Sequence, residues 1–225
     1  MTQRDVFSKS EGDNYYQRNK GRLTSADQIA ADDPILNSLA ALELHPKDIL
    51  EVGCSNGWRL NECRRIYRAK CFGIDPSAKA IADGAATFGG LDLRPGTADN
   101  LAFDNAAFDL VIFGFCLYLC DREDLFKIAC EADRVLREKG HIAILDFYPP
   151  FAYRNEYQHQ AGIYSYKMDY AKMFLWNPFY NLVSRSVLTH SGLARIDEPD
   201  ERLSVVLLRK NVEFAYPKNP FVTED

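Results

Sequence analysis

The chain lacks any hydrophobic run near the roughly 18 residues that a membrane span needs, and its first residues form no apolar signal-peptide core. Its 225 residues carry a formal net charge of −5, so the excess positive charge typical of proteins that bind a phosphate backbone is also missing. These two deficits predict a soluble, cytoplasmic protein whose partners include no nucleic acid and no membrane.

The sequence also lacks the spacings of a metal site. Its six cysteines include no pair separated by two residues, and none stands at metal-ligand spacing from any of the four histidines. Cys116 and Cys120 would lie one turn apart on a helix, but two such ligands do not hold zinc. We therefore predict reduced thiols and no metal.

Apolar runs and helical patterns alternate through the middle of the chain, which contains no internal repeat. Short apolar runs predict five strands, at residues 49–52, 71–74, 91–93, 108–113 and 141–147. Helical patterns predict helices between them, at residues 60–69, 77–88 and 123–138, with Gly140 ending the last. This alternation predicts one α/β domain, in which a parallel sheet carries helices on both faces.

The two ends of the chain depart from this alternation. Residues 1–33 are polar and predict a partly mobile arm with a helix possible from Ser25, whereas Asp33-Pro34 predicts the start of the next helix. An aromatic-rich stretch of irregular period reaches residue 180, and two further strands, at 180–188 and 203–209, predict an antiparallel pair. The chain thus divides into an arm, a core, an insert and a terminal strand pair with a tail, at residues 1–33, 34–148, 149–180 and 181–225.

The most informative segment joins the first two predicted strands. The first apolar run ends at Glu51 and enters a turn that contains Gly53 and Gly57, and the next run ends at Asp75, 24 residues after Glu51. A βαβ unit that holds a nucleoside at the carboxyl ends of its strands needs this order, with the second acid placed to bind a ribose hydroxyl. The glycines let the backbone approach a ligand where a Cβ would clash.

Four segments in this order resemble the motifs of the class I S-adenosylmethionine-dependent methyltransferases of the small-molecule type. They are residues 51–57, 73–77, 96–103 and 108–115, followed by a similar helix-turn-strand at 134–144. The resemblance covers about residues 34–148 and the terminal strand pair. It implies a Rossmann-like, doubly wound, seven-stranded mixed sheet of five parallel strands and an antiparallel pair, with the aromatic-rich insert before the last two strands.

The resemblance also implies the roles of individual residues toward S-adenosylmethionine. Glu51 would order the turn and place negative charge near the ammonium or sulfonium, and Asp75 would accept hydrogen bonds from the ribose. Asp99 would accept from the adenine amine, although it could instead only cap a turn. The predicted cofactor set is Tyr16, Arg18, Glu51, Gly53, Cys54, Ser55, Asn56, Gly57, Asp75, Pro76, Ser77, Ala98, Asp99, Asn100, Phe113, Gly114 and Phe115.

The arm is predicted to contact the cofactor, and the insert is predicted to contact the methyl acceptor. The arm would fold over the cofactor, with Tyr16 shielding the sulfonium and Arg18 binding a carboxylate or phosphate; a disordered tail is the alternative. The insert would recognise the acceptor, and the predicted catalytic residues are His159, Tyr166 and Tyr118. His159 would take the acceptor's proton, and Tyr118, which follows the fourth strand, would lie near the methyl group. The alternative is that the aromatic residues of the insert are core and its charges are solvated.

Ser55 stands where the family motif has its middle glycine, so residues 53–57 also read G-x-S-x-G, the nucleophile elbow of α/β-hydrolases. A serine hydrolase is therefore one alternative, and a non-catalytic S-adenosylmethionine-binding protein is another. The leading hypothesis is an enzyme, a monomer or homodimer, that transfers a methyl group in line to a small hydroxylated or amino-bearing metabolite. A sugar or a nucleotide-linked sugar is one such acceptor.

Overall fold

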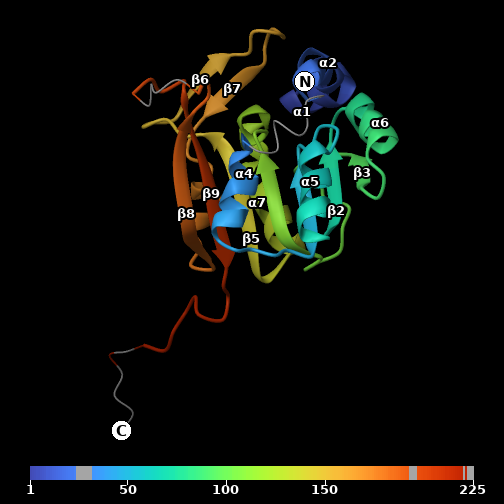
Figure 1. The fold of residues 1–225 in the computed structure, drawn as a ribbon. Helices are drawn as coiled ribbons and strands as arrows, with labels where there is room; N and C mark the ends of the chain where they lie inside the picture. The colour runs from blue at the N-terminus through green and yellow to red at the C-terminus, as the bar shows by residue number, and fades with distance from the viewer. Residues whose placement is uncertain (24–31, 193–196, 220, 222–225) are drawn as a thin grey trace.

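Seven strands form one sheet, in the order β3-β2-β1-β4-β5-β9-β8 (Figure 1). The computed structural model describes residues 1–23, 32–192, 197–219 and 221. Strands β1 to β5 are parallel, and β9 pairs antiparallel with both β5 and β8, so the predicted fold class is confirmed. The strands are β1 (Asp48–Val52), β2 (Lys70–Asp75), β3 (Asp92–Pro95), β4 (Phe108–Gly114), β5 (Leu136–Phe147), β8 (Tyr180–Thr189) and β9 (Arg202–Lys210).

Helices α4 (Pro34–Ala41), α5 (Trp58–Tyr67), α6 (Ala78–Thr87) and α7 (Leu125–Val135) pack on this sheet. Helix α4 begins as the sequence predicts, because the Asp33 carboxylate accepts a hydrogen bond from the Leu36 amide at 2.9 Å. The central strands β1 and β4 are buried almost throughout, as expected for strands covered on both faces. In the described residues, no helix is both long and apolar enough to cross a bilayer.

The predicted boundary between α7 and β5 is wrong. The helix ends at Val135, and Leu136 is already extended, 1% exposed and paired with Phe108 in β4. Gly140 lies inside β5, where a Cβ would come within 2.7 Å of the Leu136 side chain. The glycine therefore makes room for a buried neighbour instead of ending a helix, and burial of Leu136 outweighs the helical pattern of the polar residues after it.

The N-terminal segment is helical over residues 3–23, where the sequence predicts a partly mobile arm. It contains α1 (Gln3–Val6), the π-helix η1 (Phe7–Glu11) and α2 (Gly12–Leu23), and Figure 1 shows it beside α6 at the edge toward which the parallel strands point. Its polar side chains contact the core: Asp13 accepts from the Ser77 hydroxyl at 2.7 Å and from the Lys79 amide at 3.1 Å. The helix predicted from Ser25 lies outside the described residues.

The insert is more regular than its sequence suggests. Strands β6 (Tyr153–Glu156) and β7 (Tyr164–Lys167) form a hairpin, and a short helix, α8 (Lys172–Leu175), follows. Tyr170 and Phe174 are each 2% exposed and belong to the main core. Part of the aromatic content of the insert is therefore core, and the hairpin stands at the same edge of the sheet as the N-terminal helices (Figure 1).

Candidate functional site

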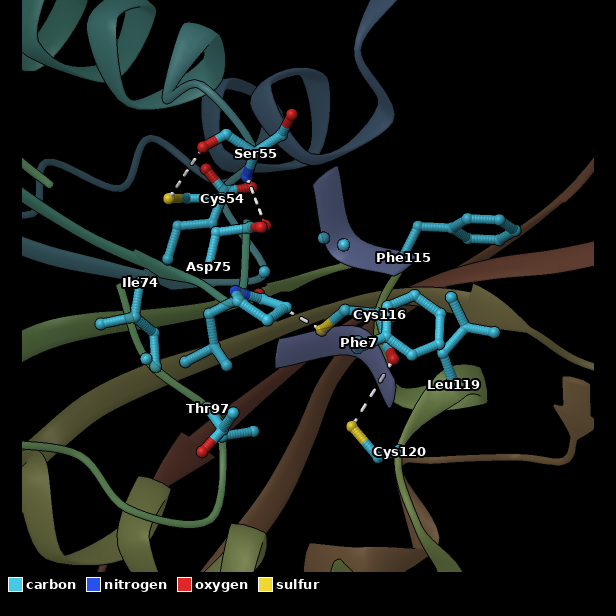
Figure 2. Close-up of a pocket in the computed structure, with 18 of the residues that line it drawn as sticks. Phe7, Cys54, Ser55, Ile74, Asp75, Thr97, Phe115, Cys116, Leu119 and Cys120 are labelled. Carbon is cyan, nitrogen blue, oxygen red and sulfur yellow. Dashed lines mark hydrogen bonds between the residues drawn. The ribbon is translucent and has the colours of Figure 1, made fainter. Parts of the chain in front are cut away.

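A cavity of about 310 Å³ lies at the carboxyl ends of β1, β2 and β4, beneath the N-terminal helices. Its size lies within the range of small-molecule sites, ~300–1,000 Å³. Figure 2 shows part of its lining, in which the Ser55 backbone amide faces the Asp75 carboxylate. Of the predicted cofactor residues, the lining contains Tyr16, Glu51, Gly53, Cys54, Ser55, Asp75, Pro76, Ala98, Asp99, Gly114 and Phe115.

The turn after β1 bends tightly enough to form one wall of this cavity. Gly53 and Gly57 have φ of +75° and +78°, and a Cβ on Gly53 would come within 2.6 Å of the Cys116 side chain. The Gly53 and Cys54 amides both donate to the Ile74 carbonyl, at 2.9 and 3.0 Å. These bonds fix the turn against the end of β2.

Asp75 fastens the same turn from the other side. Its Oδ2 accepts from the Ser55 amide and its Oδ1 from the Ser77 amide, both at 2.8 Å. Burial raises the pKa of Asp75 to about 6, against the effect of these two hydrogen bonds. Each carboxylate oxygen retains a second lone pair, so Asp75 can still accept from a ligand in the cavity.

Glu51 belongs to a buried charge network at the end of β1. Its Oε1 is paired with Arg59, which also bonds Asp33 at 3.0 Å. Burial raises the pKa of Glu51 to about 7 although the Arg59 charge opposes this. Its other oxygen, Oε2, is buried without a hydrogen-bond partner in the described structure. A cationic group in the cavity would satisfy that oxygen.

Asp99 anchors the start of the N-terminal helices. It is 5% exposed, and its Oδ2 accepts from Arg4 at 2.5 Å and from Lys127 at 3.0 Å. Burial opposes ionisation, but the Lys127 hydrogen bond and the Arg4 charge outweigh it and lower the pKa of Asp99. Asp121 accepts from the Gln3 and Arg4 amides at 2.9 and 2.8 Å. Sequence reasoning missed Arg4, whose partners lie about 95 and 120 residues away.

Six predicted cofactor residues are outside the lining: Arg18, Asn56, Gly57, Ser77, Asn100 and Phe113. Arg18 binds Glu11 and donates to the Tyr157 hydroxyl at 3.0 Å, so it links α2 to the insert. Ser77 caps α6, and Phe113 is 1% exposed in the core. Direct cofactor contacts for these six remain predictions.

The three residues predicted for the acceptor also lie outside the cavity lining. His159 is exposed in the loop of the β6–β7 hairpin, with its ring 5.4 Å from that of Tyr157. Tyr166 packs under the Arg122 guanidinium, at 4.4 Å. Tyr118 is 7% exposed, and its hydroxyl lies beside that of Tyr15. Tyr15 does line the cavity, and its proximity to Tyr16 in sequence was the only signal that could have identified it.

Ser55 adopts a left-handed conformation, with φ of +53°, which costs an L-residue about 1–2 kcal/mol. Substituting Ser55→Gly should therefore raise the free energy of unfolding, by up to about 1 kcal/mol after the entropic cost of glycine. Urea denaturation of both proteins measures the difference. A loss of stability would mean that the serine side chain makes a stabilising contact that outweighs its strained backbone.

Asp146, at the end of β5, is 2% exposed and accepts from the Phe147 and Tyr118 amides at 2.8 and 3.3 Å. Burial raises its pKa from 3.8 to about 7. The folded state therefore binds more protons than the unfolded state between about pH 4 and 7, and this group's contribution to stability falls as pH rises through that window. Substituting Asp146→Asn should reduce the fall in the free energy of unfolding between pH 5 and 8, measured by urea denaturation. If the pH dependence of the free energy of unfolding were unchanged, the raised pKa would not belong to Asp146.

Residues 50–144 match a family model described as a methyltransferase domain. The chain is 33% identical over 111 residues to the phthiotriol/phenolphthiotriol dimycocerosates methyltransferase of Mycobacterium leprae, which covers 48% of this chain and 40% of that protein. It is 29% identical over 145 residues to the demethylmenaquinone methyltransferase of Thermotoga maritima, covering 61% and 56%. These matches thus span about half the length of the curated relatives.

Two solved structures share the fold at low sequence identity. The 1,6-didemethyltoxoflavin-N1-methyltransferase of Burkholderia thailandensis, solved with S-adenosylhomocysteine, has a TM-score of 0.63 at 14% identity and covers 88% of this chain and 87% of its own. A putative methyltransferase in complex with the Haloferax volcanii Trm112 activator has a TM-score of 0.65 at 17% identity, covering 92% and 97%.

Proposed function

Because residues 50–144 belong to the class I S-adenosylmethionine-dependent methyltransferase family, we propose that the chain methylates a small hydroxylated or amino-bearing metabolite with S-adenosylmethionine. The observation that carries the proposal is the unpartnered, buried Glu51 Oε2 in a cavity that also contains Asp75 and the left-handed turn. The two relatives are named for phthiotriol or phenolphthiotriol dimycocerosates and for demethylmenaquinone, which supports a metabolite as the acceptor in place of a macromolecule.

The residues of the cavity fit the chemical parts of S-adenosylmethionine. Glu51 can accept from an ammonium group or lie beside a sulfonium, and the turn that contains Gly53 gives close backbone access to the amino-acid part. Asp75 retains lone pairs for a ribose diol, and Asp99 lies at the next strand end for the adenine. When bound, the cofactor supplies a methyl group activated by its positively charged sulfur. The chain's own task is to align the acceptor and exclude water.

The N-terminal helices are proposed to cover the cofactor, and the insert to recognise the acceptor. Arg4, Phe7, Tyr15 and Tyr16 line the cavity from above, which supports the first role. The Gln3 side chain joins the two parts: its oxygen accepts from the Tyr164 amide at 2.8 Å, and its nitrogen donates to the Tyr164 carbonyl at 3.1 Å. Closure of the helices and placement of the insert would therefore be coupled.

The serine-hydrolase alternative receives no support from the surroundings of Ser55. Its amide donates to Asp75, and the described residues that line the cavity include no histidine to act as its base. A non-catalytic S-adenosylmethionine-binding protein would differ from an enzyme only in lacking methyl transfer. An assay of methyl transfer therefore distinguishes the two.

Isothermal titration of the full chain with S-adenosylmethionine, followed by transfer of a labelled methyl group to a fractionated metabolite extract, tests the proposal. We expect saturable binding and label in at least one small-molecule fraction, with release of S-adenosylhomocysteine. Absence of binding would refute the proposed function. Binding without transfer to any fraction would favour the non-catalytic protein.

A further inference from the structure

Four aromatic side chains meet beside the cofactor cavity: Phe115, Tyr118, Phe147 and His190. The Phe115 ring lies 4.9 Å from that of Tyr118 and 5.0 Å from that of Phe147, measured between centroids. The His190 ring is stacked on both phenylalanines, 5.7 Å from Phe115 and 6.2 Å from Phe147, with interplanar angles of 28° and 20°. We refer to these four residues as the aromatic cluster.

The topology of the sheet explains why residues so distant in sequence form the aromatic cluster. Strand β9 runs antiparallel to both β5 and β8, so β8 points in the same direction as β4 and β5. The carboxyl ends of all three strands therefore reach the same edge of the sheet. Phe115 and His190 directly follow β4 and β8, and Phe147 is the last residue of β5.

Phe115 connects the aromatic cluster to the cofactor cavity, because it lines that cavity as well. Figure 2 shows its ring directed away from Ser55 and Asp75. Its φ of +66° is unusual for an aromatic residue, and its amide donates to the Leu145 carbonyl at 2.8 Å. Strained backbone of this kind is concentrated at ligand sites, where it fixes the direction of a side chain.

The polar groups around the aromatic cluster are hydroxyls, the Lys167 cation with its partner Asp200, and the Asp146 carboxylate, which accepts from the Phe147 and Tyr118 amides. The Tyr15 hydroxyl, which lies beside that of Tyr118, comes from a residue that lines the cavity. Lys167 Nζ lies 4.0 Å from the Phe147 ring centre and is paired with Asp200 at 2.6 Å. The surroundings therefore favour a flat, uncharged ring with a hydroxyl group over an anionic acceptor.

We propose that the aromatic cluster binds the methyl acceptor, and that the acceptor is a flat conjugated ring carrying a hydroxyl group. The ring lies against Phe115 and His190, and the Tyr15–Tyr118 hydroxyl pair hydrogen-bonds the acceptor's hydroxyl. This inference rests on the proposed function and narrows its acceptor class to phenol-like compounds. It predicts that sugar nucleotides do not bind as acceptors.

Titration calorimetry with 1-naphthol, on the full chain saturated with S-adenosylhomocysteine, tests the inference. His190→Ala should weaken naphthol binding by about two- to tenfold, as expected for loss of one aromatic pair, and His190→Phe should restore it. Phe115→Ala should weaken binding by at least as much. The matched control is His45→Ala: His45 is also exposed and contacts one ring, that of Tyr67 at 6.2 Å, but it precedes β1 at the opposite edge of the sheet.

The two proposals fail in different ways. Naphthol binding that is absent, or that His190→Ala and Phe115→Ala leave unchanged, would overturn the acceptor site, as would binding of uridine diphosphate glucose in place of naphthol. If the unmodified chain failed to bind S-adenosylhomocysteine, the proposed function itself would be overturned. His190→Ala should leave the affinity for S-adenosylhomocysteine unchanged, which separates loss of the acceptor site from general misfolding.

Discussion

Replacing Asp75 with alanine should weaken binding of S-adenosylmethionine by at least tenfold, which corresponds to about 1.4 kcal/mol. The substitution removes the proposed acceptor of the ribose hydroxyls. It also leaves the partly buried Ser55 and Ser77 amides without their acceptor, and each such loss costs up to about 1–3 kcal/mol. Because the Ser55 amide belongs to the cofactor turn, the same change loosens the wall of the cavity.

Titration calorimetry of the full chain with S-adenosylmethionine measures this effect. Asp92→Ala is the matched control, since Asp92 lies on the neighbouring strand β3 and pairs with the exposed Arg94 at 2.6 Å. The control should bind as the unmodified chain does. Equal affinities for the Asp75 variant and the control would show that the second family motif has been assigned to the wrong residue.

Replacing Arg59 with methionine should lower the free energy of unfolding by about 3–5 kcal/mol. Arg59 is 7% exposed and holds both Glu51 and Asp33, which are 1% and 4% exposed. Methionine fills a similar volume without charge, so two buried carboxylates lose their compensating cation. The pKa of Glu51, already raised to about 7 by burial, should then rise further because the Arg59 charge was opposing that rise.

Urea denaturation at pH 7 measures the loss, and Arg94→Met is the control. Arg94 pairs with Asp92 at the surface, where such an ion pair contributes about 0–1 kcal/mol. If Arg59→Met costs less than about 1 kcal/mol, the network of Asp33, Arg59 and Glu51 does not hold the end of β1 in place. The cofactor site would then be supported by the turn and Asp75 alone.

The strands and the cofactor turn could be predicted because their signals are local. Asp33-Pro34 begins α4, and each of the five parallel strands overlaps its predicted range, although β5 begins earlier, at Leu136. A short apolar run predicts a strand, because buried backbone groups must be hydrogen-bonded in a sheet. The glycines that follow predict a tight turn, because glycine adopts positive φ without strain. The family assignment followed from four such segments in order.

Regions where distant contacts decide the structure were predicted less well. The α7–β5 boundary depends on Leu136 pairing with Phe108, and the helices at the N-terminus depend on partners such as Asp99 and Asp121. The sequence predicts a partly mobile arm because its polar residues carry no local sign of those partners. The hairpin in the insert was missed for a different reason: its two short strands lie in an aromatic-rich stretch of irregular period.

The amino-acid sequence by itself determined the class of fold, the order of its strands along the chain and the positions of the turn and acids that identify the family. Each of these depends on interactions between residues near in sequence. Only the tertiary structure decided which side chains from the arm, the insert and the last strands reach the edge of the sheet where Glu51 and Asp75 lie. Tyr15 and His190 arrive there because strand direction and helix packing bring together residues that no local pattern connects.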